Sequence, residues 1–171
     1  MILADLYLRQ GKLDEVSDKV DKMLFIDNTF LGADMFNIAV AIARKDTADA
    51  WRSYRKIKQV VSRERIMRNL NYYAFEFEKR KNYELGFRLV DFALIMDSAS
   101  ASAMYPYSTL AELHGLTGNK KGFYDNIIKA VNLGYDLTGT EVINSEPYKT
   151  LSSDQEYKDI VKQTLTKAKP R

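Results

Sequence analysis

An internal repeat of about 35 residues is the feature that most constrains the fold of this chain. An alanine marks each copy, at Ala4, Ala39, Ala74 and Ala111, with spacings of 35, 35 and 37 residues. The residues at fixed distances from each alanine lie on one face of a helix, and the last of them marks a turn that ends it. The flanking residues are Leu3, Ile38, Tyr73 and Leu110 one position before the alanine; Tyr7, Ile42, Phe77 and His114 three positions after it; and Gly11, Asp46, Lys81 and Gly118 seven positions after it.

A second helix is predicted after each turn, because apolar residues recur there at spacings of four and then three. Few helix breakers interrupt the pattern, since the chain holds eight glycines and three prolines. In the second copy, we expect the turn to be one residue shorter than in the others. The apolar stripes of the second helices are Val16, Val20 and Met23; Ala50, Tyr54 and Ile57; Gly86, Val90 and Ala93; and Phe123, Ile127 and Ala130.

These units predict an all-α fold, a right-handed solenoid of about four helix hairpins over residues 1–135. A capping segment is expected over residues 136–171. In it, Pro147 opens a short helical turn. A final amphipathic helix then covers the last hairpin, with an apolar side formed by Tyr157, Ile160, Val161 and Leu165.

The repeat resembles the tetratricopeptide repeat, whose period is about 34 residues. The resemblance covers about residues 1–135, although Asn28, Ser98 and Tyr135 replace the proline that closes the family's repeats. It implies a groove, lined by the first helix of each hairpin, that takes a peptide or another domain. The matching segments are Leu70-x2-Tyr73-Ala74-x2-Phe77 and Tyr107-x2-Leu110-Ala111-x2-His114 for the first helix, and Gly86-x3-Val90 and Phe123-x3-Ile127 for the second.

The resemblance places in this groove the residues that flank the buried stripe of each first helix. We therefore interpret the chain as a non-enzymatic scaffold that binds another protein, a peptide or an upstream domain of the same polypeptide. The rings of Phe36, Tyr72, Phe75 and Tyr105 are expected to be semi-exposed. The alternative that the chain's own tail or a neighbouring domain fills the groove stays open. The candidate residues are Phe36, Asn37, Val40 and Arg44; Arg68, Asn71, Tyr72, Phe75 and Lys79; and Tyr105, Ser108, Thr109 and Glu112.

No residue pattern in the sequence points to catalysis or to a bound metal. The absence of cysteine excludes thiolate catalysis and cysteine–zinc sites. His114 is the sole histidine and takes the ring position of the fourth copy, while Glu112, two residues away, lies on another face of the helix. We expect His114 to be structural, and we predict no catalytic, cofactor-binding or metal-binding residue.

The stretch 44–68 is the most basic part of the chain, with nine lysines and arginines against three acids. Trp51 and Tyr54 lie among the bases, as residues that stack on nucleobases do. Nucleic-acid binding is a lesser alternative, because the bases also suit the solvated side of a helix whose buried stripe is Ala50, Tyr54, Ile57 and Val61.

The same module also suits the C-terminal appendage of an upstream bacterial enzyme such as a hydrolase. Leu3 and Ala4 already lie within the repeat pattern, which leads us to expect that the chain is part of a longer protein. The segment MRNLNYYAFEFEKRKNYELGFRLVDFALIMDS resembles repeats that trail some bacterial serine hydrolases. No apolar run approaches ~18–20 residues, so no membrane span is expected.

Overall fold

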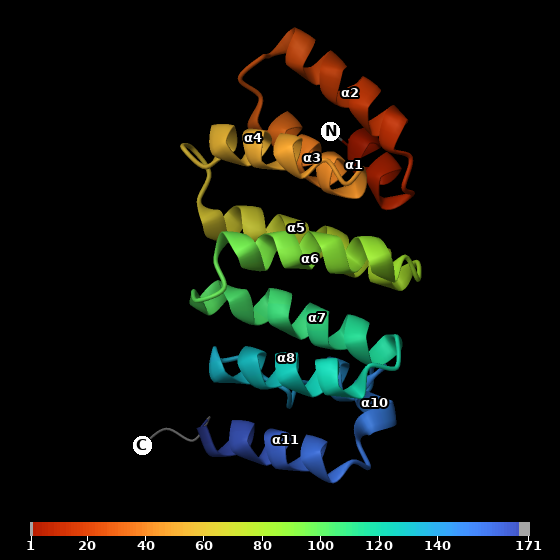
Figure 1. Ribbon diagram of the computed structural model, residues 1–171, viewed down its shortest axis with the longest axis vertical. Coiled ribbons are helices and arrows are strands. Elements are labelled where there is room, and N and C mark those ends of the chain that lie inside the picture. The colour runs from red at the N-terminus through yellow and green to blue at the C-terminus, as the bar shows by residue number, and fades with distance from the viewer. Residues whose placement is uncertain (1, 168–171) are drawn as a thin grey trace. The chain divides into compact units, whose positions relative to one another are not determined.

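The computed structural model describes residues 2–167 as an all-α chain that divides into two compact units. We call Met1–Met96 the N-terminal unit and Asp97–Arg171 the C-terminal unit. Consecutive helices pair as the antiparallel hairpins α1/α2, α3/α4, α5/α6 and α7/α8 (Figure 1). The boundary expected at residue 135 lies inside the C-terminal unit.

The N-terminal unit contains α1 (Ile2–Arg9), α2 (Leu13–Ile26), α3 (Leu31–Ala43), α4 (Thr47–Ile57), α5 (Arg63–Lys79) and α6 (Tyr83–Met96). The C-terminal unit contains the short 3₁₀ helix η1 (Ala101–Ala103), α7 (Met104–Leu116), α8 (Lys120–Asn132), α9 (Thr140–Ile143), α10 (Tyr148–Leu151) and α11 (Gln155–Lys167).

The repeat correctly identified the helix faces that form the core. All four marker alanines are buried, with at most 1% of their surface exposed. The stripes of the second helices are also buried, except that Met23 is partly exposed. The small side chain of alanine allows two helices to approach closely at each marker position. The repeated positions of the sequence are therefore the positions at which the two helices of each hairpin pack together.

The four hairpin turns close with the same backbone geometry. A residue with positive φ ends each first helix, and it is Gly11, Lys45, Lys81 or Gly118. The next N–H bonds to the carbonyl five residues before it, which is the Schellman closure of a helix C-terminus. In the third hairpin, this bond runs from Asn82 N to Phe77 O over 2.9 Å.

The second hairpin has a full-length turn, so the prediction of a shorter one is wrong. Its positive-φ residue is Lys45, and Asp46 N bonds to Ala41 O over 2.8 Å, as in the other turns. Asp46 instead caps α4, because its side chain accepts a hydrogen bond from Asp49 N at 2.9 Å. The missing residue lies within α3, between Ala39 and the turn.

Replacing Lys81 with glycine is expected to stabilise the protein by about 0.5–1 kcal/mol. Lys81 has a φ of 60°, where a Cβ is strained and glycine is not. The greater freedom of glycine in the unfolded chain offsets part of the gain. Thermal unfolding measures the effect. Gly118→Ala is the matched reverse change, at a φ of 79°, and should destabilise. A lower melting temperature for Lys81→Gly would contradict the turn assignment.

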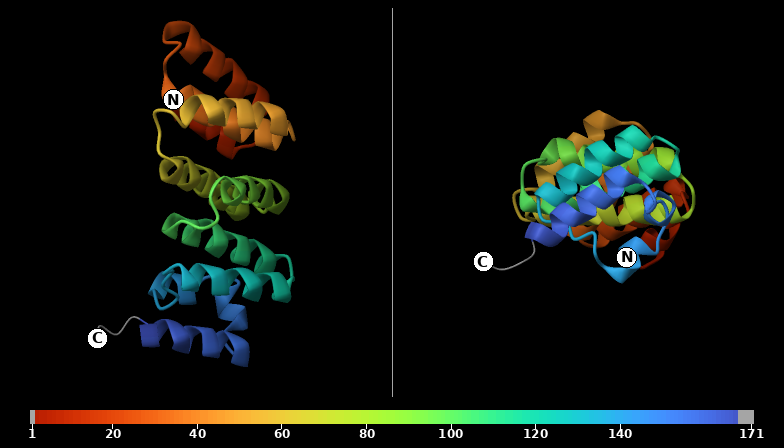
Figure 2. Two further views of the ribbon diagram at one scale, coloured as in Figure 1. Left: turned by 60° about the vertical axis from the view of Figure 1, so that its left-hand side comes forward. Right: turned by 90° about the horizontal axis from the view of Figure 1, so that it is seen from below.

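Helix α3 lies at the centre of the N-terminal unit. Besides its partner α4, it contacts α1, α2, α5 and α6. Figure 2 shows the hairpins α1/α2 and α5/α6 on either side of hairpin α3/α4 within this unit. Eight residues of α3 are buried, as expected for a helix that is apolar all round. A helix enclosed in this way leaves little surface for a partner.

Aromatic residues from the tail complete the core of the C-terminal unit. The ring of Phe123 on α8 lies 5.6 Å from that of Tyr148 and 6.4 Å from that of Tyr157. Pro147 directly precedes α10, as predicted. Helix α11 contacts α8, with Tyr157 and Ile160 buried, so the predicted final helix covers the last hairpin. The side chain of Leu165 lies outside the described residues.

Candidate functional site

Helix α5 is buried on one side and exposed on the other. Its exposed side carries Arg68, Tyr72, Phe75 and Lys79, at spacings of four, three and four residues. These spacings align the four side chains along the helix, and we call them the α5 stripe. The side chains of Tyr72 and Phe75 are 43% and 39% exposed. The sequence therefore predicted correctly that these two rings are semi-exposed.

Neighbouring groups hold the rings of the α5 stripe in place. The ammonium of Lys79 lies 4.2 Å from the centroid of the Phe75 ring, a cation–π contact. The Tyr72 ring packs edge-on against that of Tyr73, with centroids 5.3 Å apart. Arg68 pairs with Glu64 over 3.5 Å. Ordering the rings beforehand lowers the entropy that a partner must overcome on binding.

A pocket of about 270 Å³ adjoins the α5 stripe, between the N-terminal halves of α3 and α5. Its volume is slightly below the range typical of small-molecule sites, which start near 300 Å³. It suits one apolar side chain of a partner better than a whole cofactor. Leu31, Met35, Phe36, Val61 and Tyr73 supply its apolar lining, and Arg65 and Asn69 supply its polar lining.

Helix α1 fixes one wall of this pocket. The hydroxyl of Tyr73 donates a hydrogen bond to the carboxylate of Asp5 over 3.2 Å. Burial raises the pKa of Tyr73 well above its usual value, and the charge of Asp5 adds to the shift. Tyr73 therefore stays a neutral donor, and its ring also contacts the rings of Phe36 and Tyr72.

An ion-pair network also joins α1 to the C-terminal half of α5. Glu76 is buried and accepts hydrogen bonds from Lys79 at 3.2 Å and Arg80 at 3.1 Å. The guanidinium of Arg9 lies 3.7 Å from the same carboxylate. Burial acts to raise the pKa of Glu76, but the hydrogen bonds from Arg80 and Lys79 outweigh it and hold the pKa below its usual value. The carboxylate of Glu76 is therefore paired within the fold and links α1 to α5.

The predicted groove residues on α3 are mostly buried. Phe36 is 4% exposed, so the expectation of a semi-exposed ring is wrong for it. Val40 is also buried and Asn37 is partly buried, because four other helices besides α4 surround α3. Arg44 is exposed, but its guanidinium donates to Asp14 at 2.5 Å and Ser17 at 3.1 Å. Phe36 instead contributes to the pocket lining.

Asn71 lies at the margin of the exposed side of α5. It is partly buried, and its amide oxygen is enclosed without a hydrogen-bond partner among the described residues. We therefore leave Asn71 out of the α5 stripe. Of the predicted residues on this helix, the structure aligns Arg68, Tyr72, Phe75 and Lys79 on the exposed side.

The tail covers the predicted groove residues of the C-terminal unit. Ser108 and Thr109 are buried, and Glu112 is partly buried, whereas Tyr105 remains exposed. Tyr148 belongs to the same apolar cluster as Ala111 of α7, and Tyr135 packs against that cluster. Burial raises the pKa of Glu112 to about 7, although the Tyr148 hydroxyl acts in the opposite direction. In this unit, the tail therefore packs against α7 and α8.

His114 lies at its predicted ring position and packs on the second helix of its hairpin. A Cβ at Gly122 would lie 2.6 Å from His114 Cγ, so the ring and the glycine are in close contact. His114 Nδ1 lies 3.1 Å from Asn119 Nδ2, and Asn119 accepts a hydrogen bond from Gly122 N at the start of α8. These contacts give His114 a structural role at the α7–α8 turn.

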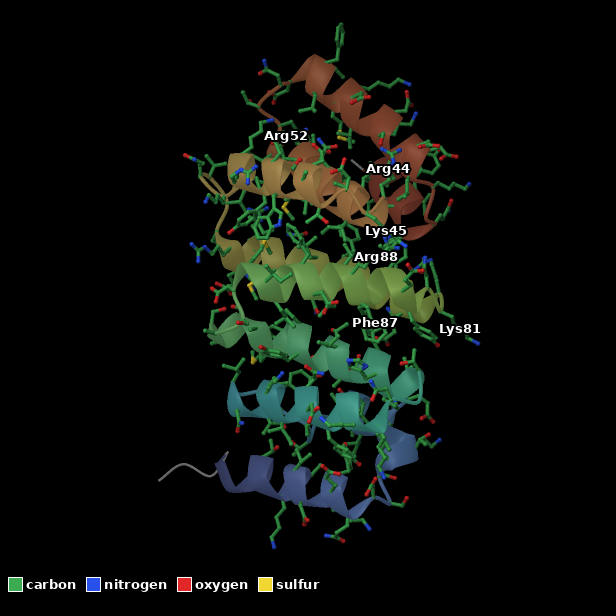
Figure 3. The ribbon with its side chains drawn as sticks, in the orientation of Figure 1. Arg44, Lys45, Arg52, Lys81, Phe87 and Arg88 are labelled. Carbon is green, nitrogen blue, oxygen red and sulfur yellow. The ribbon has the colours of Figure 1, made fainter. Side chains whose placement is uncertain are left out.

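Acidic neighbours neutralise much of the basic stretch 44–68. At the end of α3, Lys45 and Arg88 both lie near Glu84, and Arg88 also donates to the carbonyls of Ile42 and Ala43 (Figure 3). Pairing of this kind reduces the attraction for phosphates. The ion pairs are Arg44–Asp14 at 2.5 Å, Lys45–Glu84 at 3.2 Å, Arg52–Asp49 at 2.6 Å, Lys56–Asp34 at 3.0 Å and Arg68–Glu64 at 3.5 Å.

The sequence did not predict the pocket beside the α5 stripe. Its lining includes Leu31, Met35, Val61 and Arg65, which lie near the ends of helices and outside the repeated positions. A pocket of this kind depends on how two hairpins meet, and the period of a single hairpin carries no signal for it.

Comparisons with known proteins add no family to this description. No family model, no curated protein and no solved structure matches the chain. Within residues 2–167, no group of three or more histidine, aspartate or glutamate side chains is placed to hold a metal ion. No helix in this range is both long enough and apolar enough to cross a membrane.

Proposed function

We propose that the hairpins are tetratricopeptide-like repeats and that the chain is a protein-interaction module. The α5 stripe and the adjoining pocket form the binding face, and the partner is a peptide or a domain of another protein. One observation carries this proposal: two ordered aromatic rings are exposed side by side along α5, next to an apolar pocket. Aromatic side chains are enriched at the centres of protein interfaces.

The energy available from these rings supports the assignment. Binding energy concentrates in a few anchors, commonly aromatic residues or arginine. Removing a large apolar side chain from water contributes roughly 1.5–3 kcal/mol. Tyr72 and Phe75 are partly exposed already, so burial by a partner gains part of this amount for each ring. Arg68 and Lys79 flank the rings, but they are paired with Glu64 and Glu76, so the rings supply most of the binding energy.

A Tyr72→Ala, Phe75→Ala double variant tests the proposal. Peptides are selected from a random phage-displayed library against the wild-type protein, and their affinities are then measured by titration calorimetry. We expect the double variant to bind them roughly tenfold more weakly or worse, which corresponds to a loss of about 1.4 kcal/mol. Its melting temperature should fall only slightly, because both rings are partly exposed and lie outside the core.

Phe25→Ala is the matched control, because Phe25 is an exposed ring elsewhere in the N-terminal unit. Its peptide affinity should equal that of the wild type. A lower melting temperature for the double variant with unchanged affinity would mean that the rings serve stability, and the binding face would then be wrongly assigned.

A further inference from the structure

A second apolar surface lies on the hairpin α1/α2, away from the α5 stripe. It is a wide, open groove of about 550 Å³ between the two helices. Leu3 is 53% exposed and Ile26 is 85% exposed, and Ile2 and Met23 extend the apolar area. Exposed apolar patches of this kind are typical of interaction sites. We call Leu3, Lys22 and Ile26 the end face.

The repeat shows which residues correspond to the end face in the hairpin α5/α6. The two hairpins align at an offset of 70 residues, from Ala4 to Ala74 and from Val16 to Gly86. The positive-φ residues Gly11 and Lys81 obey the same offset. Leu3 therefore corresponds to Tyr73, Lys22 to Phe92 and Ile26 to Met96.

In the hairpin α5/α6, these positions are buried. Tyr73, Phe92 and Met96 are at most 9% exposed. Two of them contact the preceding hairpin, α3/α4, directly. The rings of Phe36 and Tyr73 are 6.3 Å apart, and those of Trp51 and Phe92 are 4.7 Å apart. In the hairpin α5/α6, the corresponding face is therefore covered by a helix hairpin that presents two aromatic rings, Phe36 and Trp51.

We infer that the end face docks a helix hairpin that presents aromatic side chains at the places of Phe36 and Trp51. Leu3 contacts the ring at the place of Phe36, as Tyr73 does in the hairpin α5/α6. Lys22 corresponds to Phe92, which contacts Trp51. At the end face, the ammonium of Lys22 would therefore contact the second ring of the docked hairpin in a cation–π interaction. This surface is continuous with the stacking of hairpins already seen in the N-terminal unit, and it is independent of the α5 stripe.

A chimera tests this inference with a hairpin of known face. Residues 30–71 are copied ahead of Ile2, so that the copied Asn71 joins Ile2 as the native Asn71 joins Tyr72. The copy then continues into α1 in the register of α5 and presents Phe36 and Trp51 to the end face. We expect added helical circular dichroism and a melting temperature several degrees above that of the parent protein, because a docked repeat stabilises its neighbour.

Leu3→Lys with Ile26→Lys supplies the control. In the chimera, this pair should abolish the gain in melting temperature. In the parent protein, it should leave melting unchanged, because both side chains are exposed. An unfolded copy, or a folded copy without added stability, overturns the inference. Sedimentation that shows a dimer of the parent, lost on the same double substitution, also overturns it and assigns the face to a second copy.

Discussion

Replacing Tyr148 with alanine is expected to lower the free energy of unfolding by about 3–5 kcal/mol. Tyr148 is fully buried, and its ring packs against Phe123 at 5.6 Å and Tyr157 at 6.3 Å. The substitution leaves a cavity at the point where the tail joins α7 and α8. Tyr148 thus connects the tail to the hairpin that it covers.

Urea denaturation followed by circular dichroism measures this loss. Lys149→Ala is the matched control, because Lys149 follows Tyr148 in α10 and is exposed. It should change stability little. The single tryptophan, Trp51, lies in the N-terminal unit, so its fluorescence reports on that unit separately. A loss below about 1 kcal/mol for Tyr148→Ala would mean that the tail does not complete the core.

Replacing Glu112 with glutamine is expected to stabilise the protein by about 3 kcal/mol at neutral to alkaline pH. Burial raises the pKa of Glu112 from 4.5 to about 7. Between these values, the folded state retains a proton that the unfolded state has released. The stability of the wild type therefore falls as pH rises through this range, and it levels off above it. Glutamine stays neutral throughout and avoids this loss.

Unfolding free energies measured from about pH 4 to pH 8 distinguish the two proteins. The variant and the wild type should agree at the acidic end and diverge as pH rises. Glu156→Gln removes one carboxylate at an exposed position and should keep the pH dependence of the wild type. Parallel curves for Glu112→Gln and the wild type would show that the carboxyl of Glu112 is well solvated.

Local packing could be predicted from the sequence because it repeats. Ala74 and Ala111 are fully buried, as their register requires, and both belong to hairpins with the predicted turns at Lys81 and Gly118. A helix period reports which side of a helix meets its hairpin partner. The same helix period also indicated that Tyr72 and Phe75 lie beside the buried stripe and not within it.

Contacts between hairpins could not be predicted in this way. Phe36 has the same local pattern as an exposed groove ring, but α1 and α5 both contact its helix and bury it. Glu112 likewise lies on the predicted side of α7, where Tyr148 covers it from a segment that has no repeat. Both outcomes depend on the path of the chain in three dimensions, which a period of about 35 residues does not encode.

The binding face on α5 is the central claim, and nuclear magnetic resonance tests it most directly. Isotope-labelled protein is titrated with a peptide selected from the random library, and the shifts of the backbone amides are mapped along the chain. We predict that the largest shifts fall within residues 65–79 and at the pocket residues Leu31 and Met35. Shifts centred elsewhere, or binding that leaves the amides of Tyr72 and Phe75 unchanged, would contradict the assignment.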